Sequence, residues 1–140
     1  MTRASVLLSL VVLTMAAAPA GAEHEVYYRY VVLGFVKDAT GGAVSGRELE
    51  LIRDKTGFSY LAATDEKGFF LIIARLGDES AGEALTLRVG PAVARLTATF
   101  DPVNHRDDRG TRVDLEGAQF VERSALFRST LVDALGTPSR

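Results

Sequence analysis

The loop from Asp101 to Gly110 holds the densest group of side chains that could bind a metal ion. Its oxygen-bearing side chains, of the kind that Ca²⁺ prefers, are Asp101, Asn104, Asp107 and Asp108. Arg106 and Arg109 lie in the same loop, and the spacing is not that of an EF-hand. Two interpretations stay open: a weak calcium site, or a solvated hairpin with Asp–Arg pairs that contribute little to stability.

Side chains that could carry catalysis are sparse. The chain has no Cys, which excludes a thiolate nucleophile, disulfides, thiolate metal sites and a lipidated cysteine anchor. Its two histidines, His24 and His105, belong to no His-Glu-x-x-His motif, and no P-loop or Gly-x-Ser-x-Gly is present. We therefore predict no catalytic residue and no enzymatic activity. A hydrolase would require His105 to cluster with Asp and Ser in a pocket.

Aromatic and apolar side chains near the two ends of the predicted domain could form a protein interface. Tyr28 and Tyr30 share one face of the first predicted strand, and tyrosine is common at protein interfaces. Phe127 and Leu131 recur at helical spacing in the tail. We take these four residues as the candidate interface, with packing inside the domain as the alternative.

The first 22 residues have the pattern of a secretory signal peptide. Arg3 is their one charge, an apolar stretch follows from Ser5 to Met15, and the segment ends in Ala20-x-Ala22. The apolar stretch is shorter than the about 20 residues that span a bilayer. We predict cleavage after Ala22, a periplasmic or secreted protein, and no stable membrane insertion after cleavage.

Length and charge bear on the number of domains and on nucleic-acid binding. The 140 residues suit one domain. Sixteen basic against eighteen acidic side chains give a formal charge of −2, which does not favour nucleic acid as a partner.

The chain after the signal peptide reads as β-strands separated by turns. Alternation of apolar and polar residues, or short apolar runs, predicts seven strands: Tyr27–Lys37, Arg47–Arg53, Phe58–Ala63, Phe69–Leu76, Ala84–Val89, Ala92–Phe100 and Thr111–Glu116. This number and spacing predict an all-β, seven-stranded antiparallel sandwich over residues 23–118.

The tail over residues 119–140 has a different period. Apolar residues recur at helical spacing, which predicts an amphipathic helix from about Phe120 to Leu135, ended by Gly136 and Pro138. The helix either packs on the sandwich's own surface or docks on a partner. We expect the first.

Glycines and aspartates in the predicted turns carry a family resemblance. The pattern is Gly34-x-Val36-x-Asp38-x-x-Gly41-x-Ala43-Val44-x-Gly46-x-x-Leu49-x-Leu51, followed by Thr64-Asp65-x-x-Gly68-x-Phe70. It resembles the carboxypeptidase regulatory-like domain, although that family usually has Pro at the position of Ala43 and a small residue at that of Arg47. The resemblance implies a transthyretin-like (prealbumin-like) fold and a non-catalytic module.

The same residues have a physical interpretation of their own. Asp38 and Asp65 can accept hydrogen bonds from backbone amides downstream, and Gly41, Gly46 and Gly68 allow tight reversals. Their role is structural. The transthyretin-like hydroxyisourate hydrolases share only the expected architecture, because their Tyr-Arg-Gly-Ser ending is absent here.

The prediction is an exported, non-catalytic β-sandwich whose partner is another periplasmic or envelope protein, with no cofactor beyond the weak calcium hypothesis. The alternative is a module that binds carbohydrate or calcium, and a transthyretin-like hydrolase comes third.

Overall fold

The computed structural model describes residues 26–136, so the predicted signal peptide over residues 1–22 lies outside the described residues. Eight strands form: β1 (Tyr28–Lys37), β2 (Glu48–Arg53), β3 (Ser59–Ala63), β4 (Phe69–Leu76), β5 (Ala84–Val89), β6 (Ala92–Thr97), β7 (Arg109–Glu116) and β8 (Gln119–Glu122). A 3₁₀ turn, η1 (Asp78–Ser80), precedes β5, and η2 (Ser124–Leu126) leads into the helix α1 (Phe127–Leu135).

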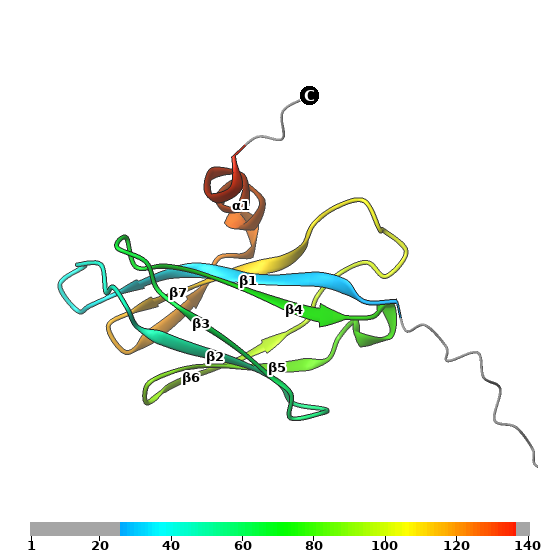
Figure 1. The fold of residues 1–140 in the computed structure, drawn as a ribbon, viewed down its shortest axis with the longest axis horizontal. Helices are drawn as coiled ribbons and strands as arrows, with labels where there is room; N and C mark the ends of the chain where they lie inside the picture. The colour runs from blue at the N-terminus through cyan, green and yellow to red at the C-terminus, as the bar shows by residue number, and fades with distance from the viewer. Residues whose placement is uncertain (1–25, 137–140) are drawn as a thin grey trace, which may run out of the picture.

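The strands form two four-stranded sheets, in the orders β4-β1-β7-β8 and β3-β2-β5-β6 (Figure 1). The architecture is therefore a β-sandwich with one short helix near its carboxyl end. Two details differ from the sequence prediction. There are eight strands instead of seven, and β1 pairs with β7 in parallel while the other strand pairs are antiparallel.

The additional strand comes from the start of the segment predicted as a helix. Phe120 pairs with Leu115 and Val121 with Asp114 across the turn at Gly117 and Ala118. The apolar residues at 120 and 121 fit a helical period as well as they fit a strand. Backbone pairing with β7 decides between the two, and the helix begins only at Phe127.

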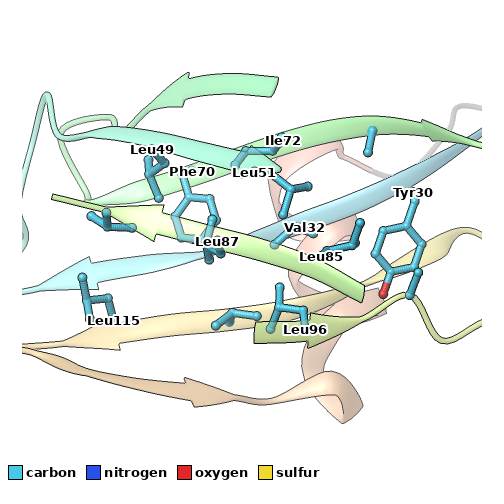
Figure 2. Close-up of a cluster of buried hydrophobic side chains, with 14 of the residues drawn as sticks. Tyr30, Val32, Leu49, Leu51, Phe70, Ile72, Leu85, Leu87, Leu96 and Leu115 are labelled. Atoms are coloured by element: carbon cyan, nitrogen blue, oxygen red, sulfur yellow. The ribbon is translucent and has the colours of Figure 1, made fainter. Parts of the chain in front are cut away.

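The core lies between the sheets. Leucines from one sheet, among them Leu51, Leu85 and Leu87, face Val32, Phe70 and other residues of the opposite sheet (Figure 2). These side chains are at most 2% exposed. Each is worth roughly 1.5–3 kcal/mol of burial free energy, so inter-sheet packing supplies the main stabilisation of a chain without disulfides.

A second, smaller cluster lies on the other side of the β4-β1-β7-β8 sheet. Phe127 and Leu131 of α1 pack on Val31 and Leu33 of β1. Because α1 covers this face, β1 is buried on both sides, which explains why its centre is apolar on both faces (Figure 1). The prediction that the tail helix packs on its own domain agrees with this structure.

Candidate functional site

Arg109, the first residue of β7, lies at one end of the sandwich with its side chain only 6% exposed. Its Nη2 donates to the Asp78 Oδ1 at 3.0 Å and to the backbone carbonyls of three loop residues, Asp101, Pro102 and Asn104, at 3.1–3.4 Å. Its Nη1 is buried and has no hydrogen-bond partner among the described residues. One cation thus holds the 101–104 loop to η1.

Aromatic rings complete the surroundings of Arg109. Its guanidinium carbon lies 4.7 Å from the centre of the Tyr28 ring and 4.2 Å from that of Phe100, both within the range of a cation–π contact. The His105 ring stacks on Tyr28 with centroids 4.5 Å apart. Tyr28, Phe100, His105, Asp78 and Arg109 therefore form one cluster, which we call the Arg109 cluster.

Asp78 binds both His105 and Arg109 in this cluster. His105 Nε2 lies 2.8 Å from Asp78 Oδ2, while Arg109 binds the other carboxylate oxygen. Partial burial alone would raise the pKa of Asp78, but the hydrogen bonds from His105 and Arg109 outweigh it and hold the pKa below its usual value. No Ser or Thr hydroxyl bonds to the His105 ring among the described residues, so the geometry expected of a Ser–His–Asp site is not found there.

The four residues of the calcium hypothesis do not form a cation site in the described part of the chain. Asp101 Oδ1 accepts the Val103 N–H, and Asn104 Nδ2 donates to Asp107 Oδ2 at 2.8 Å. Asp107 also forms an ion pair with Arg128. The hydrogen bonds that Asp107 accepts from Asn104 and from Arg128 lower the pKa of its carboxyl group. Asp108 has no hydrogen bond or ion pair among the described residues.

The Arg109 guanidinium takes up the backbone carbonyls that a calcium ion in this loop would use. No group of three or more His, Cys, Asp or Glu side chains within residues 26–136 could hold a metal ion. The loop therefore has Asp–Arg pairs of the kind that the hairpin interpretation expects, and the calcium hypothesis stays a prediction.

A second buried charge cluster lies beneath α1. Asp114, whose side chain is 4% exposed, accepts hydrogen bonds from Arg112, from Arg123 and from the backbone N–H of Phe35 at 3.0 Å. Desolvation would raise the Asp114 pKa, but the two arginines and the Phe35 amide keep it low. Arg112 Nη1 then reaches Thr130 Oγ1 on α1 at 3.0 Å, so this cluster positions the helix.

Gly34 is required for that arrangement. A Cβ at position 34 would lie 1.8 Å from the Val113 carbonyl oxygen and 3.1 Å from Asp114 Oδ1. Only a residue without a side chain allows β1 and β7 to approach so closely. Gly34 thus makes room for the backbone carbonyl of Val113 on β7, with the Asp114 carboxylate beside it.

The turn residues of the motif bind their own loops. Asp38 Oδ1 accepts the backbone N–H groups of Thr40 and Gly42, and Asp65 Oδ1 accepts those of Lys67 and Phe69. Gly41, Gly46 and Gly68 all have positive φ, between 68° and 86°, where residues with a Cβ are strained. These five residues shape turns.

Three of the four candidate interface residues are buried, which corrects that prediction. Tyr30 is 1% exposed, Phe127 4% and Leu131 5%. Burial between the sheets raises the pKa of the Tyr30 hydroxyl to about 12. Tyr28 is half-buried and engaged in the Arg109 cluster. Their apolar character serves packing, as the alternative interpretation held.

The surface that stays open is the outer side of the β3-β2-β5-β6 sheet. No described helix or loop lies over it, whereas α1 covers the opposite sheet (Figure 1). Leu61 of β3 is 78% exposed and Val93 of β6 is 52% exposed. The sheet also has a hollow of about 530 Å³, lined among others by Glu48, Glu50, Leu61 and Arg88. We call this surface the open face.

The residues of the open face are not among the candidate site residues predicted from the sequence. The alternation over β2 placed Glu48 and Glu50 outward, but neighbouring side chains on a sheet face come from strands whose order the sequence does not state. The signal available was Leu61 on β3, at a position that the alternation of Tyr60 and Ala62 directs outward.

Comparison with known proteins adds no family. No protein-family model matches the chain, and no curated protein matches it. Within the part of the chain that the structure describes, the helices are too short or too polar to cross a membrane.

Proposed function

We propose that this chain is an exported, non-catalytic β-sandwich module that acts by binding another protein molecule of the periplasm or envelope. Its proposed type is the transthyretin-like sandwich of the carboxypeptidase regulatory-like domains. The signal-peptide pattern of residues 1–22 and the turn motif of Asp38 and Asp65 support export and type, respectively.

One observation carries the binding function: the open face is a broad sheet surface with exposed apolar side chains. On the other sheet, α1 packs over the outer side of β1 at Val31 and Leu33, whereas no described helix packs on this one. Leu61 and Val93 are apolar side chains that water solvates poorly, and both lie on the open face. A protein partner that covers this face would bury them.

Site-specific photocrosslinking in living cells tests the binding function. A photoreactive amino acid at position 61 should give a covalent adduct with a protein in the organism that encodes the chain. The matched control is position 103, because Val103 is also apolar and 84% exposed but lies in the 98–108 loop. Absence of a protein adduct at position 61, or equal yields at 61 and 103, would contradict the function.

A further inference from the structure

Four residues, one from each strand, form a row across the open face. Leu61 lies opposite Glu50, Glu50 lies opposite Arg88, and Arg88 lies opposite Val93. All four point away from the core, because the intervening residues of the same strands, such as Leu51 and Leu87, are buried in it. The row therefore reads apolar, acidic, basic, apolar from β3 to β6.

The two charges in the middle of the row are available to a partner. Glu50 and Arg88 are directly opposed on β2 and β5, but neither side chain forms an ion pair within the described residues. Arg95, an exposed arginine on β6, differs, since it pairs with Asp54 at 3.6 Å. A partner that offers a cation to Glu50 and an anion to Arg88 would satisfy both.

The row is complementary to itself. A two-fold axis parallel to the strands, between β2 and β5, places Leu61 against Val93 of the second molecule. It places Glu50 against Arg88 and Arg88 against Glu50, so two attractive pairs form and no like charges meet. Isologous interfaces of this kind are the commonest in homodimers.

The neighbouring row obeys the same symmetry. Its residues, in order across the sheet, are Ser59, Ile52, Thr86 and Arg95. The axis places Ile52 against Thr86 and Ser59 against Arg95 of the second molecule, again without like charges. Val93 of one copy lies over Leu61 of the other, at the hollow that Leu61 lines.

We infer that the open face binds the open face of a second copy of this chain, so that two sandwiches stack sheet on sheet. This inference rests on the proposed function and names the partner. Stacked sheets pack about 10 Å apart, with mean strand directions within about 30° of each other. That spacing lets side chains of the two copies interdigitate while leaving both α1 helices on the outside.

The contact area indicates a weak, reversible dimer. Four strands about 4.8 Å apart, with about six residues each at ~3.4 Å per residue, give a footprint of roughly 400 Å². Standard interfaces bury about 800 Å² per partner, so we expect a dissociation constant in the micromolar to millimolar range. Salt should weaken the dimer because two of its contacts are ion pairs, whose attraction dissolved ions screen as the two copies approach.

Charge exchange tests the inference. The protein is expressed with its N-terminal segment, purified after export, and followed by analytical ultracentrifugation over a concentration series. Glu50→Arg and Arg88→Glu should each raise the dissociation constant at least tenfold, because each variant places like charges together in the dimer. An equimolar mixture of these two variants should associate again, as should the double variant Glu50→Arg/Arg88→Glu.

Arg106→Glu is the matched control, since it makes the same charge change on the exposed 98–108 loop and should leave association unchanged. Circular dichroism melting verifies that each variant is folded. If a single variant fails to fold, the double variant and the salt dependence of the wild type still decide. Failure of the folded double variant to associate would overturn the inference.

The outcomes separate the inference from the proposed function. A protein that stays monomeric at all concentrations, yet crosslinks at position 61 to a different protein, overturns the second copy as partner and keeps the binding function. A dimer that these substitutions leave unchanged overturns the open face as its interface. A crosslinked adduct at position 61 with twice the mass of the chain supports both the binding function and the second copy as the partner.

Discussion

Arg109 shows how a single buried side chain decides what a loop can bind. Four oxygen-bearing side chains in ten residues suggest calcium when only the sequence is considered. In the folded chain, the Arg109 guanidinium donates to the carbonyls of Asp101, Pro102 and Asn104 and to Asp78. A fixed positive charge at that position repels a divalent cation.

We predict that calcium leaves the stability of the protein unchanged. Thermal unfolding with EDTA and with millimolar Ca²⁺ should give the same melting temperature, because the Arg109 guanidinium already binds the loop carbonyls that a calcium ion would need. Arg109→Met should lower the free energy of unfolding by about 2–4 kcal/mol, since the carbonyls and Asp78 lose their donor. A rise in melting temperature with Ca²⁺ in the wild type would restore the calcium site.

Glu83 carries a pH-dependent contribution to stability. Both its carboxylate oxygens bind Arg53 at 2.8 Å, and both side chains are at most 15% exposed. The Arg53 hydrogen bonds, with one from Ser80, lower the Glu83 pKa from 4.5 to about 2. A lowered pKa in the folded state means that the contribution is complete above the unfolded pKa and disappears as the pH falls from 4.5 towards 2.

We therefore predict that Glu83→Gln costs roughly 1–2 kcal/mol at neutral pH, less than the full shift implies because the Gln amide oxygen can still accept a hydrogen bond from Arg53. Urea unfolding of the two proteins at pH 7 and near pH 2 measures this. The difference between wild type and variant should shrink at the lower pH. Glu66→Gln is the control, since Glu66 is exposed in a turn and has no ion pair among the described residues. An equal difference at both pH values would contradict the prediction.

At the scale of elements, α1 is a cover for the β4-β1-β7-β8 sheet. Phe127 and Leu131 pack on β1, Arg112 binds Thr130, and Asp107 binds Arg128. A truncation after Gly117 would remove β8 as well as α1, so it does not isolate the helix. Single substitutions in α1 test the helix alone.

Phe127→Ala should destabilise the protein by about 3–5 kcal/mol, as is usual for a large aromatic side chain removed from a buried site. Val132→Ala, on the same helix but at a 47% exposed position, should change the free energy of unfolding by less than about 0.5 kcal/mol. Urea unfolding measures both. If Phe127→Ala unfolds like the wild type, the helix does not stay docked on the sandwich in solution.

The elements also show how far sequence patterns reach. In the turn at Asp38, the hydrogen-bond partners are two and four residues further along the chain. Turns of this kind can therefore be predicted from the sequence. The parallel pairing of β1 with β7, the strand β8 and the row Leu61–Glu50–Arg88–Val93 depend on contacts between distant segments. Local periodicity cannot specify these contacts, because a strand of the same pattern can pair with several neighbours.

At the scale of the whole molecule, the two sheets have different surroundings. In one, the central strand β1 is buried on both sides, between the core and α1, and the other sheet is buried on one side only. A chain without cysteines holds this arrangement by packing and polar contacts without disulfides, and an oxidising compartment imposes no constraint on it. The fold is therefore compatible with the export that the first residues predict.

We expect the exported molecule to lack the first 22 residues. Cleavage after Ala22 should leave a chain beginning at Glu23, and only residues 23–27 then precede β1. Intact mass and N-terminal sequencing of the exported protein measure the new end. Ala22→Tyr should block processing, because the cleavage site needs small residues, whereas Glu25→Gln should not. Recovery of Met1 in the exported wild type would show that the segment stays attached, and the open face would then belong to an anchored protein.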